Sequence, residues 1–241
     1  MTREGHASCG DASRPAASAR RGNAKDANHS GARKNPGRPK GGRDAADVRR
    51  AKAAPQTRKP RVPMQLTRPV FFIGFMGAGK TSVARRLART CGISSVDMDT
   101  YLERREGKRV KEIFAEVGEE GFRAIETDVL GELAHKQECL LVSCGGGVVT
   151  RKENRAILRE TGFVVHLQVT VDEAASRISD KSTRPLFQDI EAARERCLER
   201  APLYAAAADV EIDTAGKSVP RIAREVERVL EKEGVLCQRR K

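Results

Sequence analysis

Residues 70–81 read VFFIGFMGAGKT, and this stretch decides the fold. The apolar run Val70–Ile73 predicts a buried parallel strand, and the stretch from Ser82 to Thr90 predicts a helix. Between them, Gly74–Thr81 fits the P-loop pattern G-x-x-x-x-G-K-S/T. Its glycines let backbone N–H groups curl around an anion, and the helix start adds its positive dipole end. The alternative is an ordinary turn with glycines for geometry alone; the flanking strand and helix favour a P-loop.

Two side chains at the end of this pattern suit nucleotide chemistry. Lys80 is expected to reach the β- and γ-phosphates of a nucleoside triphosphate, and the Thr81 hydroxyl to ligand Mg²⁺. A second apolar segment leads into Asp97 and Asp99. Their alternation lets one carboxylate face the metal and phosphates while the other faces an acceptor. The alternative for Asp99 is to cap the helix that starts near Thr100.

The two ends of the chain differ sharply in composition. Residues 1–64 contain no Phe, Tyr, Trp, Leu or Ile, and their 16 Lys and Arg against 5 Asp and Glu supply most of the chain's net charge of +13. Such a segment buries too little apolar surface to offset its chain entropy, so we expect disorder. The chain therefore divides into a basic disordered tail and linker (1–67), a folded P-loop domain (68–235) and a short basic end (236–241).

The sequence also narrows the partners and the compartment. A solvated tail is the simplest expectation, and nucleic acid is expected only through that tail. No apolar run approaches the ~18 residues of a membrane-spanning helix, and the N-terminus lacks the apolar segment of a secretory signal. Six cysteines show no paired short spacing. Reduced thiols in the cytoplasm are the simplest account, so we expect a cytoplasmic protein without membrane contact.

Beyond residue 69, segments suited to strands alternate with helical segments. This alternation predicts an α/β fold in which helices cover both faces of a parallel sheet. The ligand site of such a sheet lies beyond the carboxyl ends of its strands, where the P-loop, the two aspartates and Gly145–Gly147 all fall. The expected strands are 70–73, 93–96, 139–143, 163–167 and 210–212, and the expected helices include 81–91, 100–105, 110–117, 119–136, 152–160, 190–207 and 219–232.

A glycine run and three arginines complete the candidate site residues. Gly145–Gly147 follows a buried strand, where backbone can approach a small ligand; a flexible turn is the alternative. Arg123 lies early in a helix, where a surface salt bridge with Glu126 is the alternative. Arg200 lies in a charged run, where a solvated arginine is the alternative. Arg184 lies in the polar segment 180–187, which suits a lid that closes over phosphates.

In order and spacing, these segments resemble the shikimate kinase family over about residues 68–232. The P-loop alone indicates a superfamily, and the Asp-x-Asp, Phe-Arg and triple-glycine set narrows it to this family. The matching segments are Gly74–Thr81, Asp97-x-Asp99, Phe122-Arg123-x-x-Glu126, Gly145–Gly147, Arg184-Pro185-Leu186 and Arg200-x-Pro202-Leu203-Tyr204. In the segment that corresponds to the family's second adenine contact, Ala215-Gly216-Lys217 matches poorly.

The resemblance implies a fold and a reaction. The fold is a P-loop NTPase three-layer sandwich with a five-stranded parallel sheet and a mobile lid, in a protein that acts as a monomer. The reaction is Mg²⁺-dependent transfer of the γ-phosphoryl group of ATP to the 3-hydroxyl of shikimate, a step of chorismate and aromatic amino-acid biosynthesis.

It also implies roles for individual residues. Asp99 would hold the shikimate hydroxyls and accept or orient the reacting proton, Arg123 and Arg200 would clamp the carboxylate, and Arg177 would stack on adenine. The implied catalytic residues are Lys80, Asp99 and Arg184; the implied metal site is Thr81 and, through water, Asp97. The implied ATP-binding residues are Gly77, Ala78, Gly79, Lys80, Thr81, Ser82, Arg177 and Arg184, and the implied substrate-binding residues are Asp99, Arg123, Gly145, Gly146, Gly147 and Arg200.

Two other functions stay open on the sequence. One is another small P-loop kinase, of gluconate or a nucleotide. Arg123 and Arg200 together with Asp99 favour a small polyol acid as acceptor. The other is a nucleic-acid-binding or scaffold protein with a vestigial kinase domain, against which the intact P-loop and aspartate pair argue.

Overall fold

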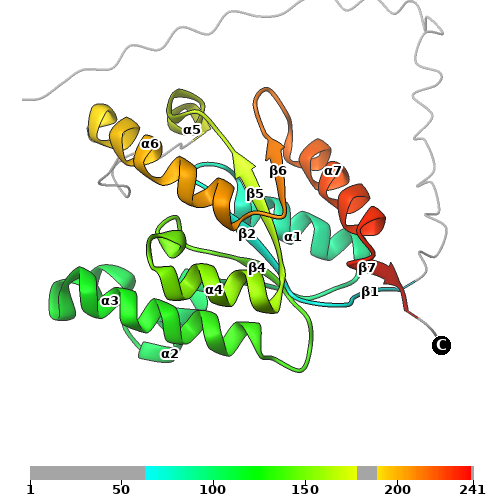
Figure 1. Ribbon diagram of the computed structural model, residues 1–241, viewed down its shortest axis with the longest axis horizontal. Helices are drawn as coiled ribbons and strands as arrows, with labels where there is room; N and C mark the ends of the chain where they lie inside the picture. Colours follow the sequence, from blue (N-terminus) through cyan, green and yellow to red (C-terminus); the bar gives the residue numbers. More distant parts are fainter. Residues whose placement is uncertain (1–62, 178–188, 240–241) are drawn as a thin grey trace, which may run out of the picture. The chain divides into compact units, whose positions relative to one another are not determined.

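The computed structural model describes residues 63–177 and 189–239. It is built on a parallel sheet of five strands in the order β3-β4-β2-β5-β6, of which β4, β2, β5 and β6 are labelled in Figure 1. The strands are β2 (Val70–Ile73), β3 (Ser95–Asp97), β4 (Leu141–Ser143), β5 (Phe163–Gln168) and β6 (Val210–Asp213). The predicted α/β fold and its five parallel strands are confirmed. Since β2 is the central strand, the P-loop leaves the sheet at its middle.

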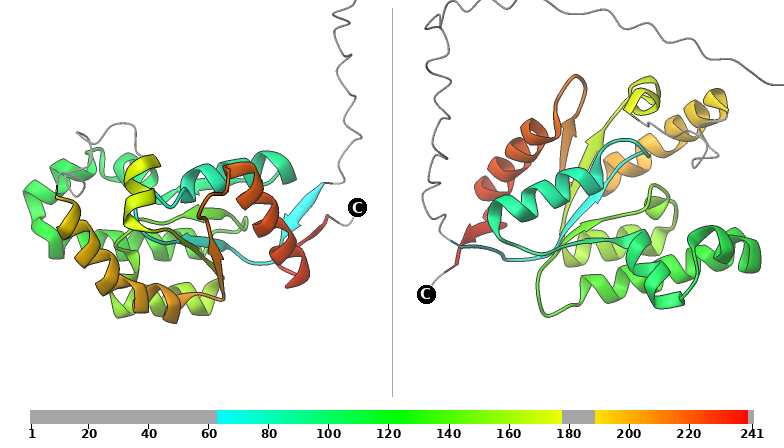
Figure 2. Two further views of the ribbon diagram at one scale, coloured as in Figure 1. Left: turned by 90° about the horizontal axis from the view of Figure 1, so that it is seen from above. Right: turned by 180° about the vertical axis from the view of Figure 1, so that it is seen from behind.

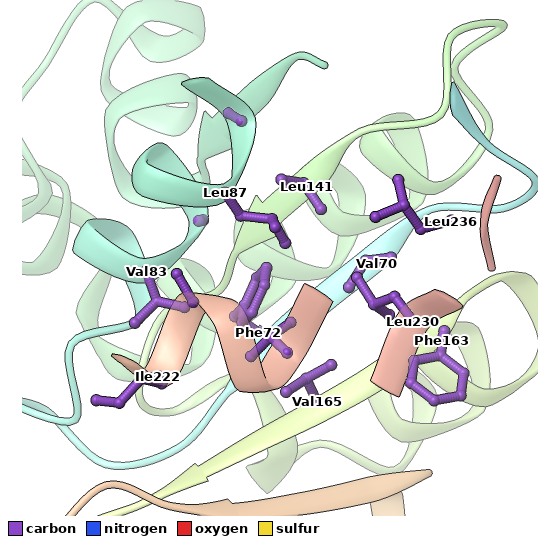
Figure 3. Packing of buried hydrophobic residues seen from close by; sticks show 14 of the residues in the cluster. Val70, Phe72, Val83, Leu87, Leu141, Phe163, Val165, Ile222, Leu230 and Leu236 are labelled. Carbon is purple, nitrogen blue, oxygen red and sulfur yellow. The ribbon is translucent and has the colours of Figure 1, made fainter. Parts of the chain in front are cut away.

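Helices cover both faces of this sheet (Figure 2). Strand β2 supplies side chains to both faces, because successive residues of a strand point to opposite sides. Val70 and Phe72 belong to the core under α1 and α7 (Figure 3), and Phe71 and Ile73 to the core under α2, α3, α4 and α6. The helices are α1 (Lys80–Cys91), α2 (Met98–Glu106), α3 (Val110–Ala134), α4 (Lys152–Thr161), α5 (Val171–Arg177), α6 (Ile190–Ala207) and α7 (Val219–Lys232), with the 3₁₀ turn η1 (Val148–Thr150).

Two local details differ from the sequence expectation or refine it. Helix α2 begins at Met98, and its N-cap is Asp97, whose Oδ1 accepts from the Thr100 N–H at 3.1 Å. The alternative that Asp99 caps this helix is therefore wrong. Helix α3 contains Gly118 in a non-helical conformation (φ 69°, ψ −174°), which separates the two helices expected there.

A short antiparallel ladder joins the two ends of the folded part. β1 (Met64–Leu66) pairs with β7 (Leu236–Gln238), and Leu66 and Leu236 are buried in the core under α1 and α7. The expected boundaries at 68 and 235 leave both strands outside the domain. Three-residue strands give almost no periodic signal, and their pairing depends on a partner at the other end of the chain.

Several predicted features lie outside the described residues: most of the tail, the lid segment 180–187 and Arg184 within it. Among the described residues, no helix is both long and apolar enough to cross a membrane.

Candidate active site

The phosphate side of the site is the P-loop between β2 and α1. Lys80 is the first residue of α1, and its buried Nζ donates hydrogen bonds to the carbonyl oxygens of Gly74 at 2.8 Å and Phe75 at 3.0 Å. Gly79, the N-cap of α1, offers no side chain to the first N–H groups of that helix. The loop therefore combines an ammonium group with an open helix N-terminus, and both attract an anion.

A hydroxyl and carboxylate cluster lies beside the P-loop, at the ends of β3 and β4. Thr81 Oγ1 donates to Asp97 Oδ2 at 2.7 Å and lies 3.0 Å from Ser143 Oγ. Mg²⁺ prefers oxygen ligands and keeps several waters, with one or two carboxylates and the phosphates of its substrate as further ligands. This donor set fits Mg²⁺ held partly through water. Ser143, the last residue of β4, was not among the site residues predicted from the sequence.

Arg123 and Glu126 form an ion pair inside the protein. Arg123 NH1 lies 2.7 Å from Glu126 Oε2, and their side chains are 12% and 2% exposed. The salt bridge with Glu126 that the sequence offered as the alternative does form, but it is buried rather than at the surface. Burial raises the pKa of Glu126, and the Asp99 carboxylate adds to this, while the guanidinium of Arg123 acts in the opposite direction. Glu126 thus fixes one edge of Arg123, whose NH2 also lies 3.4 Å from Glu119 Oε1 at the rim.

The glycine run after β4 makes room for these side chains. A Cβ built on Gly147 would lie 2.3 Å from Arg123 NH1, and one built on Gly145 would lie 2.9 Å from Glu126 Oε1 and 3.1 Å from Asp99 Oδ1. Distances this short require the neighbours to move. The run is therefore a close approach of backbone to the arginine and carboxylates, rather than a flexible turn.

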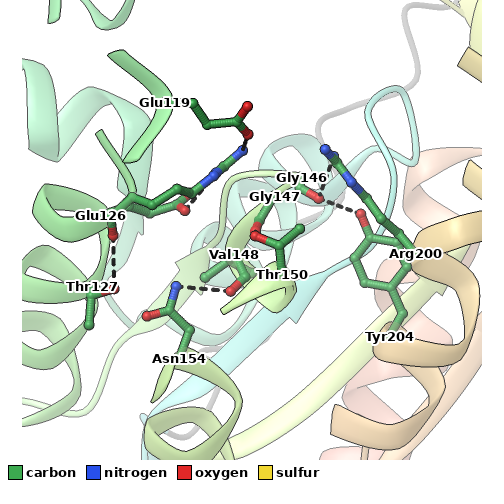
Figure 4. A network of polar contacts seen from close by, with 11 residues as sticks. Glu119, Glu126, Thr127, Gly146, Gly147, Val148, Thr150, Asn154, Arg200 and Tyr204 are labelled. Carbon is green, nitrogen blue, oxygen red and sulfur yellow. Dashed lines mark hydrogen bonds and ion pairs between the residues drawn. The ribbon is translucent and has the colours of Figure 1, made fainter. Parts of the chain in front are cut away.

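Helix α6 reaches the same glycine run from the other side. Arg200 NH1 donates to the Gly146 carbonyl oxygen at 3.2 Å, and the Tyr204 hydroxyl donates to the same oxygen at 2.5 Å (Figure 4). Arg200 thus contacts the backbone of the turn and is half-buried, so it is not simply a solvated arginine on the helix surface. Arg123 and Arg200 approach the glycine run from two different helices, α3 and α6.

The far end of the site is formed by α5 and the segment after β6. Arg177 donates to Thr214 Oγ1 at 3.0 Å and to the Thr214 carbonyl oxygen at 2.6 Å. Glu173 Oε1 accepts from Arg177 NH2 at 2.6 Å and from the Gly216 N–H at 2.9 Å. One carboxylate therefore joins the predicted adenine-side arginine to the segment that departs from the family pattern, and Lys217 of that segment also lines the cavity.

One cavity of about 960 Å³ connects these parts. Its lining includes every predicted site residue within the described residues. These are Gly77, Ala78, Gly79, Lys80, Thr81, Ser82, Asp97, Asp99, Arg123, Gly145, Gly146, Gly147, Arg177 and Arg200. The lining also includes residues that were not predicted, among them Phe114, Glu119, Ser143, Arg196 and Lys217. Their sequence context does not indicate a place in the site, except that Ser143 ends an apolar strand, as Asp97 does.

Comparison with known proteins identifies the family. The family model "Shikimate kinase" matches residues 76–231. The shikimate kinase of Geobacter metallireducens is 42% identical over 168 residues, which is 68% of this chain and 92% of that protein. The shikimate kinase of Moorella thermoacetica is 43% identical over 166 residues, covering 67% and 93%.

A solved structure gives the same result. The shikimate kinase from Acinetobacter baumannii in complex with shikimate superposes with a TM-score of 0.65 at 34% identity, covering 69% of this chain and 94% of that one. The family match spans the P-loop helix, the glycine run and both arginines, so it covers the residues that line the cavity. It also spans β3, β4, β5 and β6, and the central strand β2 lies just before it. The chain belongs to the shikimate kinase family.

Proposed function

We propose that this protein transfers the γ-phosphoryl group of ATP to the 3-hydroxyl of shikimate, giving shikimate 3-phosphate and ADP on the route to chorismate and the aromatic amino acids. The observation that carries the proposal is a cavity with a P-loop at one side and two arginines, Arg123 and Arg200, converging on a glycine run at the other. A phosphate donor and a small carboxylate acceptor can then lie side by side.

Arg123 and Arg200 bind the carboxylate of the acceptor. Planar guanidinium groups match a carboxylate in geometry as well as charge. Arg123 is held by Glu126 at 2.7 Å and Arg200 by the Gly146 carbonyl at 3.2 Å, so neither has to be ordered by the substrate. The backbone of Gly145, Gly146 and Gly147 contributes the remaining wall, where no side chain intervenes between acceptor and main chain.

Asp99 orients the acceptor hydroxyl and takes its proton. It stands in the first turn of α2, and its Oδ1 lies near Gly145, on the acceptor side of the cavity. Asp97, by contrast, is bound to Thr81 at 2.7 Å and to the Thr100 N–H at 3.1 Å. The two aspartates therefore have different roles: Asp99 acts on the acceptor hydroxyl, and Asp97 faces the metal and the phosphates.

The phosphate side stabilises charge during transfer. The transition state of phosphoryl transfer is loose, so alignment and charge stabilisation supply most of the catalysis. Lys80 and the N–H groups at the start of α1 bind the β- and γ-phosphate oxygens, and Arg184 adds a second cation from the predicted lid. Mg²⁺, which Thr81 and Asp97 would hold, neutralises phosphate charge when bound. Arg177 stacks on adenine, and Gly77, Ala78 and Ser82 complete the ATP site.

We also propose that the protein acts as a monomer. It works in a reducing cytoplasm, which suits the free cysteines among the described residues.

A coupled assay of ADP release tests the proposed function. With ATP and Mg²⁺, ADP is expected to appear quickly with shikimate and slowly with gluconate, with a nucleoside monophosphate or without acceptor. The ³¹P NMR spectrum should show a phosphomonoester of shikimate. Equal ADP release with and without shikimate, or preference for gluconate, would overturn the proposal. Lys80→Ala, prepared in parallel, shows that any ADP formed comes from this site.

A further inference from the structure

The Gly146 carbonyl oxygen accepts hydrogen bonds from two side chains of one helix. Tyr204 donates its hydroxyl at 2.5 Å and Arg200 donates NH1 at 3.2 Å, both from α6 (Figure 4). Arg200 has an evident role as a cation for a carboxylate. Tyr204 is 2% exposed and does not line the cavity, so its hydroxyl has no such role.

Behind Tyr204 stands a buried histidine that the proposed reaction does not use. His166 of β5 stacks on the Tyr204 ring, with ring centroids 5.0 Å apart and an interplanar angle of 25°. His166 Nδ1 lies 2.8 Å from Glu211 Oε1, and the two residues are register partners on β5 and β6. An ionised carboxylate only accepts hydrogen bonds, so Nδ1 carries the proton and the ring is fixed in orientation.

The charge states of both groups suit a fixed support. Burial lowers the pKa of His166, with Glu211 acting against it, and the imidazole stacks on Tyr204 as a neutral ring near neutral pH. Burial raises the pKa of Tyr204 to about 12, so its hydroxyl remains a donor. Glu211, His166 and Tyr204 thus form a chain of contacts from the edge of the sheet to the glycine run.

The orientation of one peptide unit depends on this chain of contacts. Because a peptide group is planar and trans, fixing the Gly146 oxygen also fixes the Gly147 N–H, which points to the opposite side. Both glycines line the cavity. Within residues 63–177 and 189–239, no backbone carbonyl oxygen accepts a hydrogen bond from the N–H of Gly146 or of Gly147. These N–H groups can donate to the phosphoryl-acceptor substrate. The direction of the Gly147 N–H is fixed by the hydrogen bonds on the Gly146 carbonyl oxygen.

We propose that Tyr204, braced by His166 and Glu211, is a positioning residue for the acceptor site. Its hydroxyl holds the Gly146–Gly147 peptide in the orientation in which its N–H meets the acceptor. Tyr204 touches neither substrate and acts through the turn and through Arg200, whose side chain also hydrogen-bonds its hydroxyl. The inference rests on the proposed function, because shikimate is taken as the acceptor.

Tyr204→Phe tests the hydroxyl alone. The ring, and hence the packing, stays, while the Gly146 oxygen keeps only its bond to Arg200. We expect the KM for shikimate to rise about three- to tenfold, the size of one lost hydrogen bond. The KM for ATP and the kcat at saturating shikimate should stay within about twofold. The matched control is Tyr101→Phe, since Tyr101 donates its hydroxyl at the surface, to Glu132 at 3.2 Å.

Variants of His166 test the brace. His166→Ala removes the ring against which Tyr204 stacks and should raise the KM for shikimate as Tyr204→Phe does. His166→Phe restores a ring of similar shape and should return that KM to within about twofold of the unsubstituted protein. Melting temperatures are measured for every variant. A purely structural role predicts lower melting temperatures with no selective change in the KM for shikimate.

The outcomes separate this inference from the proposed function. If the unsubstituted protein forms no ADP with shikimate, the proposed function fails and the inference fails with it. If that protein is active and Tyr204→Phe leaves the KM for shikimate unchanged, or raises both KM values equally, the inference alone is wrong. A selective rise that His166→Ala reproduces and His166→Phe reverses supports it.

Discussion

Two glycine-rich turns meet in the cavity, and they use glycine for different reasons. Gly79 of the P-loop has φ +90°, and a Cβ there would meet nothing within 4 Å. Gly147 of the second turn has an ordinary φ of −99°, but a Cβ there would lie 2.3 Å from Arg123 NH1. The first glycine is needed for its backbone conformation and the second for the space beside it. A loop of the first kind is visible as a local pattern, whereas the second depends on a helix elsewhere in the chain.

The largest loss of activity is expected from a substitution in the P-loop. Lys80→Ala removes the cation that the loop holds through Gly74 and Phe75, so kcat should fall by about a hundred- to a thousandfold. Turnover is measured at saturating shikimate and ATP. Lys108→Ala, which removes a surface lysine paired with Glu116, is the control and should keep full activity. A Lys80→Ala enzyme with near-normal turnover would contradict the role assigned to this lysine.

Arg123→Ala removes the arginine that packs against Gly147 and should weaken the binding of shikimate. Loss of a charge-assisted bond predicts a rise of about ten- to a hundredfold in the KM for shikimate, with the KM for ATP nearly unchanged. Equal losses for both substrates would place Arg123 outside the acceptor pocket. Arg151→Ala, which removes an arginine paired with Glu120 at the surface, serves as control.

The stability of Arg123→Ala should also depend on pH in a characteristic way. Without Arg123, the buried Glu126 loses the group that opposes the burial-driven rise of its pKa. An acid whose folded-state pKa lies above its unfolded value binds more protons when folded, so stability falls as pH rises between the two values. The melting temperature of Arg123→Ala should therefore fall further below that of the unsubstituted protein as the pH rises above the ordinary pKa of a glutamate, about 4.3. A constant difference would show that Glu126 is not the cause.

A pair of glycine variants sharpens the contrast between the turns. Gly147→Ala should raise the KM for shikimate about tenfold, because the new methyl group displaces the Arg123 guanidinium. Gly79→Ala places an L-residue at positive φ, at a cost of about 1–2 kcal/mol, and should weaken ATP binding instead. The test is to measure the KM values for shikimate and for ATP in both variants. If the two substitutions affect the same substrate, the turns do not have separate roles.

The smallest effect is expected outside both turns. Removal of residues 1–62 should leave kinetics and melting temperature unchanged. Removal of residues 1–67 also deletes β1 and the buried Leu66, which contributes about 1.5–3 kcal/mol, and should lower the melting temperature by several degrees. Differential scanning calorimetry of the two truncated proteins tests this, and identical melting temperatures would show that the β1–β7 ladder adds no stability.

What the sequence predicts well is what neighbouring residues determine. The apolar runs identify the strands, and the P-loop pattern identifies the phosphate site. The family resemblance identifies candidate site residues, and those that the structure describes all line the cavity. What it misses is set by contacts between distant segments. Ser143 lies beside Thr81 only because β4 and the P-loop helix meet at one edge of the sheet. The burial of the Arg123–Glu126 pair likewise depends on neighbours that the local charge pattern does not reveal.

The β1–β7 ladder also determines how the folded part can be circularly permuted. The Arg239 N–H donates to the Pro63 carbonyl oxygen at 2.7 Å, so the two ends of this part lie side by side. A linker of a few residues could join them in a circularly permuted enzyme, with new ends opened at the exposed Gln137–Glu138 turn. A fluorescent or affinity domain fused directly at Pro63 or at Arg239 would leave the folded part from neighbouring positions.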